Sequence, residues 1–241
     1  MASVHNLIVK RGEAEILKNF SAEFPEHQVT AVSGRSGCGK TTLLSVLLNL
    51  LPADSGEIHG FQKPSAVFQE DRLLPYLTAA KNISVAAGCT ETAAEKALLQ
   101  VGFDPEDLKK NAVQLSGGMA RRVSIVRAML TSGDAVLLDE PFKGLDDLTR
   151  EKVMQFVKEN LKNRTTILVT HDPRDAKDLK AVKIIEMETE KWFAHRRKSP
   201  RRNVKSFWSN FFSKGEQTVQ WTVCSWKTLL RGFRWICIAN P

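Results

Sequence analysis

The chain has 241 residues, 42% of them hydrophobic, which is enough to bury a substantial core in one or two domains. It contains no apolar run that approaches the roughly 18–20 residues needed to cross a bilayer. Its first ten residues lack the basic region, apolar block and small-residue cleavage site of an export signal. Four cysteines without paired close spacing argue against a disulfide framework or a zinc site and predict reduced thiols. We therefore expect a cytoplasmic chain.

The net charge of +8 is unevenly distributed. Residues 191–241 contain eleven Lys or Arg and one acid, a net charge of +10, which leaves −2 for residues 1–190. The same segment holds all five tryptophans. We therefore divide the chain into a domain, residues 1–190, and a basic, aromatic tail, residues 191–241. Three interpretations of the tail stay open: a membrane-surface or partner-binding segment, a nucleic-acid contact, or an unrelated extension such as a shifted reading frame would produce.

The predicted elements follow a recognisable order along the chain. Alternating apolar residues over positions 4–24 predict short antiparallel strands. Residues 28–32 predict a strand that feeds a glycine-rich turn, and residues 41–50 predict a helix that stops near Pro52. Further buried strands, at 65–68, 135–138, 166–169 and 182–185, alternate with helical stretches, as in a parallel α/β sheet. The segment between Leu77 and Leu130, rich in Ala, Leu, Lys and Glu, predicts an inserted α-helical subdomain.

Residues 34–41 read Gly-Arg-Ser-Gly-Cys-Gly-Lys-Thr and fit the pattern G-x-x-x-x-G-K-[ST] between a predicted strand and a predicted helix. Glycines let the backbone turn tightly, so that N–H groups and the helix N-terminus surround a phosphate chain. Lys40 is expected to bond the β- and γ-phosphates, and Thr41 to offer its hydroxyl to Mg²⁺. The sequence predicts a Mg-ATP site formed by Gly34, Arg35, Ser36, Gly37, Cys38, Gly39, Lys40, Thr41 and Thr42.

Two acids end the apolar strand at residues 135–138. Adjacent carboxylates at the end of a buried strand are costly unless they meet a cation or a bound substrate. Asp139 is therefore expected to hold Mg²⁺ beside Thr41, and Glu140 to orient or deprotonate the attacking water. The alternative, two acids that begin a solvated turn before Pro141, loses weight because the phosphate-binding pattern lies upstream.

Residues 115–119, Leu-Ser-Gly-Gly-Met, with Arg121 and Arg122 following and Asp139-Glu140 downstream, resemble the signature of the ATP-binding-cassette (ABC) ATPases. The resemblance extends from about residue 4 to about residue 186. It implies a P-loop NTPase fold, in which a RecA-like parallel sheet is joined by an antiparallel β layer and an inserted α-helical subdomain.

The same resemblance implies further site residues. Gln69 is similar to the glutamine that senses Mg²⁺ and water, and His171 to the switch histidine that contacts the γ-phosphate. Residues 144–146, ending in Asp146, resemble the loop that reaches across a dimer. Ser116, Gly117 and Gly118 begin a helix and so offer a second anion site, which in the family faces the γ-phosphate held by the opposite subunit. A second ATPase subunit, identical or different, is therefore an expected partner.

The implied function is ATP hydrolysis that energises solute transport through separate permease subunits, at the inner face of the cell membrane. Residues 68–78 and 140–142 resemble those of importers for nitrate, sulfonate or taurine, which also implies a solute-binding protein. Two rivals remain: a mechanochemical ABC ATPase that acts on nucleic acid or ribosomes, and a non-catalytic nucleotide-binding module. The sequence contains neither the long coiled-coil insertions nor the second cassette that would support the first rival, so nucleic acid is not an expected partner. The intact set of Lys40, Asp139, Glu140 and His171 argues against the second.

Two positions depart from the family pattern. Where an aromatic residue is expected to stack on adenine, the sequence reads Lys10-Arg11-Gly12, and the guanidinium of Arg11 can stack on a base instead. Met119 stands where a glutamine is more usual. Neither change touches the phosphate chemistry.

Overall fold

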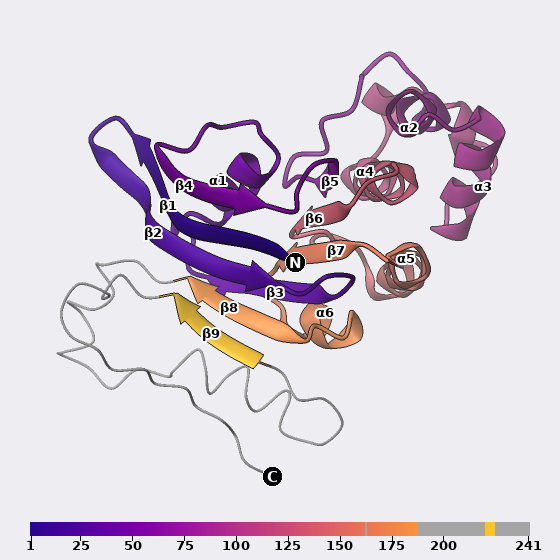
Figure 1. Ribbon diagram of the computed structural model, residues 1–241. Coiled ribbons are helices and arrows are strands. Elements are labelled where there is room, and N and C mark those ends of the chain that lie inside the picture. Colours follow the sequence, from indigo (N-terminus) through magenta and orange to yellow (C-terminus); the bar gives the residue numbers. More distant parts are fainter. Residues whose placement is uncertain (162, 188–219, 225–241) are drawn as a thin grey trace, which may run out of the picture.

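The computed structural model describes residues 1–161, 163–187 and 220–224, and within them the chain forms two sheets (Figure 1). In this part of the chain, six parallel strands form the larger sheet in the order β5-β6-β7-β3-β8-β9: β3 (Val29–Gly34), β5 (Pro64–Val67), β6 (Ala135–Asp139), β7 (Thr165–Val169), β8 (Lys183–Met187) and β9 (Gln220–Cys224). The smaller, antiparallel sheet has the order β2-β1-β4: β1 (Ala2–Arg11), β2 (Ala14–Phe24) and β4 (Ser55–His59).

Strands β3, β6, β7 and β8 of the parallel sheet are buried along nearly their whole length, which explains why apolar residues dominate most of them in the sequence. Strand β6 shows this directly. Ala135 and Leu137 belong to the core shared with the antiparallel sheet, and Val136 and Leu138 to the core shared with the helices on the other side. All four residues have no exposed surface.

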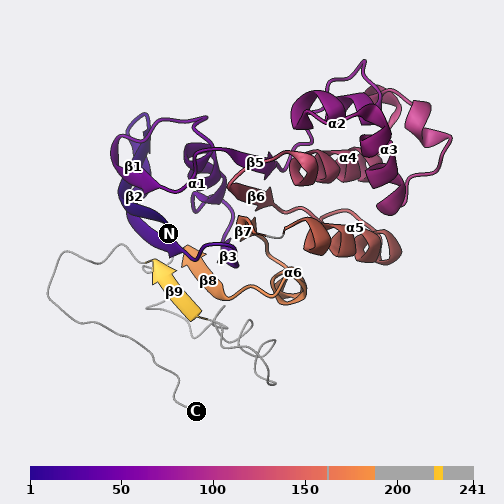
Figure 2. The ribbon, with the colours of Figure 1, turned by 45° about the vertical axis from the view of Figure 1, so that its right-hand side comes forward.

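Helix α1 (Lys40–Leu47) lies between the two sheets (Figure 2). Its buried residues Leu43, Leu44, Val46 and Leu47 share a core with β1, β2 and one face of the parallel sheet. This packing fixes the start of the helix, and with it the glycine-rich turn that precedes it.

The remaining helices lie on the other side of the parallel sheet: α2 (Ala79–Ala87), α3 (Glu91–Gln100), α4 (Gly117–Leu130), α5 (Asp147–Asn160) and α6 (Pro173–Asp178). Two 3₁₀ turns, Asp107–Lys109 and Ala112–Gln114, lead into α4. Several helices begin at a side chain that accepts a backbone N–H, as Thr78 does for α2 and Thr90 for α3. Helices α2, α3 and α4 fall within the range 77–130 predicted to be helical.

The parallel sheet, the antiparallel layer and the helical insertion agree with the predicted fold class. Strand β4 escaped sequence analysis because Ile58 is its one apolar residue and most of the strand is exposed. Helix α1 ends at Leu47, three residues earlier than expected, and the chain turns away at Asn49, which has a φ of 56°.

The predicted tail lies outside the described residues except for β9, a strand that sequence analysis did not predict. Strand β9 pairs in parallel with β8, from Lys183 opposite Gln220 to Met187 opposite Cys224. The division at residue 190 stays a prediction. Among the residues that the structure describes, no helix combines the length and the apolar character needed to cross a membrane.

Candidate nucleotide-binding site

The turn between β3 and α1 is packed too closely for side chains at two of its glycines. A Cβ atom on Gly34 would lie 2.4 Å from the carbonyl oxygen of Met187 in β8. Gly39, with a φ of 98°, faces Leu17 of β2, whose Cδ2 would lie 2.8 Å from an added Cβ. Both positions therefore require glycine, and the turn is held between the two sheets.

Lys40 is the first residue of α1, and its ammonium group lies inside the turn. Nζ donates hydrogen bonds to the carbonyl oxygens of Gly34 at 2.6 Å and Arg35 at 2.9 Å. The buried Cys38 thiol lies beside it, and burial raises the pKa of that thiol, so Cys38 stays protonated at neutral pH. A cation enclosed by a glycine-rich turn at a helix N-terminus is suited to the β- and γ-phosphates of a nucleotide.

Thr41 and Asp139 offer the oxygen ligands that a magnesium ion needs. Thr41 Oγ1 donates a hydrogen bond to Asp139 Oδ2 at 3.1 Å. Burial raises the pKa of Asp139, and the Thr41 hydrogen bond and the positive charge of Lys40 oppose this shift. A buried carboxylate beside a hydroxyl is a donor set that fits a hard divalent cation, which would also offset the cost of burying the charge.

Glu140 follows β6 in a strained backbone conformation, with a φ of 50°, which is uncommon for a residue other than glycine. Its N–H donates to the carbonyl oxygen of Val169 at 2.9 Å, so the neighbouring strand β7 holds the turn. Burial raises the pKa of Glu140, opposed by Lys143. A carboxylate whose pKa is shifted toward neutrality is suited to accept a proton from water.

His171 lies 3.5 Å from Glu140, measured from Nε2 to Oε1. Burial, Lys40 and Lys143 lower the pKa of the imidazole, so His171 is neutral at neutral pH. Its contact with Glu140 is therefore a contact between a carboxylate and a neutral ring, in which the imidazole is available as a hydrogen-bond donor or acceptor.

These groups surround one pocket of about 450 Å³. One wall is made by residues of the turn and α1: Ser36, Gly37, Gly39, Lys40, Thr41 and Thr42. Gln69, Asp139, Glu140 and His171 line the same pocket. Arg11, the residue considered for base stacking, also lines the pocket, as does Ile16. The structure thus gathers most of the predicted phosphate and magnesium residues in one place, whereas Gly34, Arg35 and Cys38 belong to the same turn but do not line the pocket.

The signature residues lie elsewhere. Ser116 caps α4 by accepting the N–H of Met119 at 3.3 Å, and Asp146 caps α5 by accepting the N–H of Thr149 at 2.9 Å. None of Ser116, Gly117, Gly118 and Asp146 lines the 450 Å³ pocket. Met119, in place of the usual glutamine, packs against the main apolar core. One chain therefore carries a phosphate pocket and a separate helix N-terminus.

Arg121 and Arg127 of α4 hold the segment that carries Gln69, a role that sequence analysis missed. Arg121 donates to the carbonyl oxygens of Phe68 and Gln69, both at 2.5 Å. Arg127 donates to the carbonyl oxygens of Asp71 and Arg72 at 2.9 and 2.8 Å. A signal was present, since an arginine on the apolar face of a helix needs partners when it is buried. Lys143 also lines the pocket, and no comparable feature of the sequence indicated that it would.

Comparisons with known proteins identify the family of the chain. Residues 17–143 match the family model described as ABC transporter. The chain is 39% identical over 180 residues to the aliphatic sulfonates import ATP-binding protein SsuB 3 of Paraburkholderia xenovorans, covering 72% of each chain. It is 37% identical over 183 residues to the protein SsuB of Corynebacterium glutamicum, covering 73% of this chain and 75% of the relative.

Among solved structures, the dimeric post-hydrolysis state of the ATP-binding cassette MJ0796, bound to ADP and Pi, superposes with a TM-score of 0.70 at 28% identity. The match covers 79% of this chain and 97% of that one. The family and the fold class predicted from residues 115–119 and the phosphate-binding pattern are confirmed. The chain belongs to the ABC transporter family, as one of its ATP-binding and ATP-hydrolysing subunits.

Proposed function

We propose that the chain hydrolyses ATP in the 450 Å³ pocket, completed by the signature residues of a second subunit, and thereby energises import through separate membrane subunits. The observation that carries this proposal is the convergence of Lys40, Thr41, Asp139, Glu140 and His171 around one pocket. Family membership makes the chain an ATPase whose ligands are ATP and Mg²⁺.

Each side chain has a distinct task in this proposal. Lys40 binds the β- and γ-phosphates. Thr41, Asp139 and Gln69 would hold Mg²⁺, which when bound would neutralise phosphate charge. Glu140 orients the attacking water and accepts its proton at the carboxylate. The neutral imidazole of His171 contacts the γ-phosphate and keeps it in place.

A dimer is part of the proposal because the pocket and the signature helix lie on separate parts of one chain. The N-terminus of α4, with Ser116 as its cap, offers backbone N–H groups and a favourable positive potential to an anion. A γ-phosphate held by Lys40 of one subunit would meet Ser116 of the other. The solved cassette MJ0796 is itself described as dimeric, which supports this assembly.

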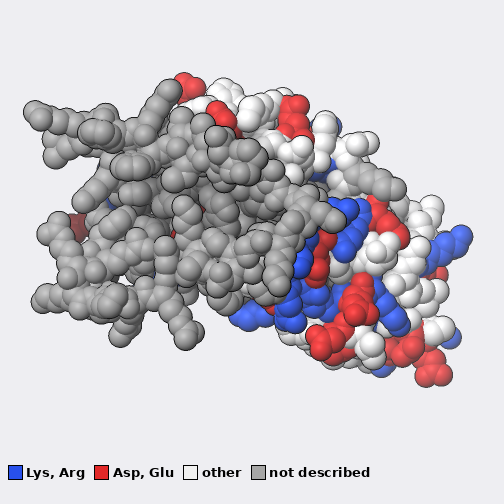
Figure 3. All heavy atoms as spheres, turned by 90° about the horizontal axis from the view of Figure 1, so that it is seen from below, with Lys and Arg blue, Asp and Glu red and all other residues white. Residues whose placement is uncertain are grey.

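The relatives named above are aliphatic sulfonates import ATP-binding proteins, which supports import of a small anionic solute, with permease subunits and a solute-binding protein as partners. Work at the inner face of the membrane follows from that assembly. The nucleic-acid alternative receives less support, since residues 1–190 carry a net charge of −2. On the face seen from below (Figure 3), the visible Lys and Arg side chains of the described residues lie interspersed with Asp and Glu.

The decisive experiment measures phosphate release and oligomeric state together. Wild-type protein should hydrolyse Mg-ATP, and Glu140→Gln should bind ATP without turnover, running as a dimer in ATP and a monomer in ADP by light scattering. Adding Ser116→Arg should abolish that dimer, because a bulky cation blocks the anion site. Wild-type turnover in Glu140→Gln would refute its role as base, and an inactive variant that stays monomeric in ATP would refute the shared nucleotide.

A further inference from the structure

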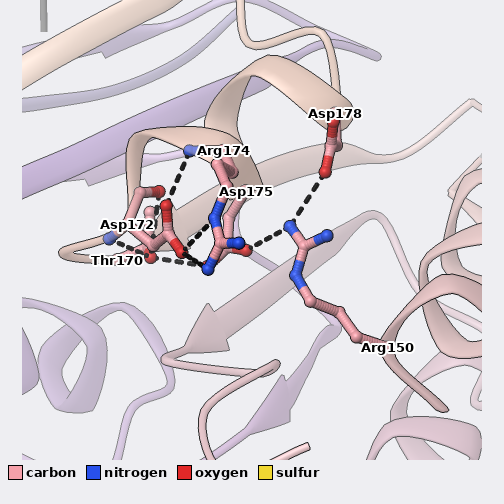
Figure 4. Close-up of polar contacts among 6 residues, drawn as sticks. All are labelled: Arg150, Thr170, Asp172, Arg174, Asp175 and Asp178. Atoms are coloured by element: carbon pink, nitrogen blue, oxygen red, sulfur yellow. Dashed lines mark hydrogen bonds and ion pairs between the residues drawn. The ribbon is translucent and has the colours of Figure 1, made fainter. Parts of the chain in front are cut away.

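A chain of polar contacts connects α5, α6 and the end of β7 (Figure 4). Arg150 Nη2 donates to Oδ1 of Asp175 at 2.8 Å. The other oxygen of that carboxylate, Oδ2, accepts a hydrogen bond from Thr170 Oγ1 at 2.7 Å. Asp175 therefore uses its two oxygens to join two different elements of the fold.

The two ends of this chain of contacts are functional segments. Thr170 directly precedes His171, and its hydroxyl also accepts the N–H of Asp172 at 3.0 Å, so the Thr170 side chain spans the histidine. At the other end, Arg150 lies in the first turn of α5, and its backbone N–H donates to the carbonyl oxygen of Asp146 at 2.8 Å. The contacts thus run from the loop 144–146 to His171.

The link formed by Arg150, Asp175 and Thr170 is buried at its centre, Asp175, and is therefore stiff. Asp175 is 5% exposed, and burial raises the pKa of its carboxyl, opposed by the hydrogen bonds from Arg150 and Thr170. Separating Arg150 from Asp175 would leave a buried charge without its partner, which is costly. The second contact of Arg150, to Asp178 Oδ2 at 2.8 Å, is more exposed and contributes less to this link.

The histidine itself is placed by the backbone that carries it. Its side chain is 55% exposed, and its ring contacts Glu140 from the pocket side. A half-exposed ring that is not enclosed by packing takes its position from the residues on either side, Thr170 and Asp172. A shift of the Thr170 hydroxyl therefore moves His171 relative to the phosphate pocket.

A second cavity, of about 490 Å³, is lined by residues from both ends of the link, the loop 144–146 and the segment around His171. Gly144 and Leu145 of the loop, Arg150, Asp175 and His171 all contribute to its walls. A side chain or loop of another subunit that entered this cavity would touch the loop and the link at once.

We propose that Arg150 and Thr170 are positioning residues which, through Asp175, make the placement of His171 depend on the loop 144–146 and hence on the arrival of a second subunit. This inference rests on the proposed function, and it takes the loop 144–146 to be a segment that meets the second subunit, as its resemblance to the family's dimer-spanning loop implies. A chain without a partner would keep its phosphate-binding residues and lack a correctly placed histidine.

The test uses Thr170→Val, which removes the hydroxyl at nearly constant shape, and Arg150→Met. Thr170→Ser is the rescue variant and Asp178→Asn the matched control. We expect kcat of the first two variants to fall by about tenfold or more, as for a small misplacement of a reacting group, with KM for ATP unchanged. Thr170→Ser and Asp178→Asn should stay within about twofold of wild type.

A spectroscopic readout separates positioning from folding. In the Glu140→Gln background with histidine-selective labelling, the ring signal of His171 should move between the ADP monomer and the ATP dimer, and it is assigned by its loss in His171→Gln. Adding Thr170→Val or Arg150→Met should keep the ATP-dependent dimer and abolish most of that movement.

Three results would overturn the inference: Thr170→Val with wild-type kcat, a raised KM at unchanged kcat, or an undiminished movement of the His171 signal in the dimer. Failure of the proposed function is a different outcome, since Glu140→Gln with Thr170 and Arg150 intact would then remain monomeric in ATP. That result would remove both proposals.

Discussion

The hydroxyl of Thr41 donates a hydrogen bond to Oδ2 of Asp139 over 3.1 Å, although 98 residues separate the two along the chain. They meet because β3, which leads into Thr41, and β6, which ends at Asp139, flank the same strand β7 in the parallel sheet. Carboxyl ends of parallel strands lie at one edge of a sheet, which is where ligands bind in α/β folds.

Lys40→Ala should abolish productive Mg-ATP binding, because it removes the cation from a turn otherwise built of backbone dipoles. We expect calorimetric affinity to fall by about a hundredfold or more, as for the loss of charge-assisted hydrogen bonds. Lys96→Ala, on the exposed side of α3, is the charge-matched control and should bind like wild type. Unchanged affinity in Lys40→Ala would contradict the assignment.

Glu140→Gln should stabilise the nucleotide-free protein at neutral pH. Burial raises the pKa of Glu140 above its ordinary value of 4.5, so its contribution to stability is present in full below pH 4.5 and is lost as the pH rises through the folded-state pKa. At neutral pH, the free energy of unfolding of the variant should exceed that of wild type by about 1.4 kcal/mol for each unit by which the pKa of Glu140 is raised. Urea unfolding at about pH 4 and at neutral pH measures this, with the exposed Glu151→Gln as control. A stability difference that does not grow with pH would contradict it.

Arg121→Met should lower kcat while leaving KM for ATP unchanged. The substitution keeps the apolar stem but removes both donors to the carbonyl oxygens of Phe68 and Gln69. Gln69 would then be placed less accurately, at a cost of about tenfold or more in kcat. Arg121→Lys offers one charged donor group in place of the two-pronged guanidinium, and its kcat should fall between those of wild type and Arg121→Met. Steady-state kinetics decides, and a tenfold rise of KM at constant kcat would assign Arg121 to nucleotide binding instead.

Arg164→Met should destabilise the fold without affecting nucleotide affinity. The buried guanidinium donates to the carbonyl oxygens of Thr131 and Met129, both at 2.9 Å, and of Asn160 at 2.7 Å, at the ends of α4 and α5. Removing the donors leaves these carbonyl oxygens unpaired, at a cost of about 2–4 kcal/mol in the free energy of unfolding. Lys158→Met on the surface of α5 is the control. A loss below about 0.5 kcal/mol would mean that other donors replace Arg164.

Features that depend on neighbouring residues could be predicted from the sequence. Strands buried on both faces appear as short apolar runs, as at residues 135–138, and glycine-rich turns have few alternatives. Elements with low burial or weak local signals could not be predicted. Strand β4 is mostly exposed, and the pairing of β9 with β8 depends on the free edge of a sheet more than 30 residues earlier in the chain.

By itself, the sequence determined the family, the order of the elements and the identity of the phosphate-binding turn, because each of these follows from contiguous residues and their spacing. Only the tertiary structure decided which distant residues meet. It placed Asp139 and His171 in one pocket with Lys40, held the Gln69 segment with Arg121, and joined Arg150 to Thr170 through Asp175. These contacts depend on strand order and on how α5 packs beside α6, and no local pattern encodes the energy of packing between segments so far apart.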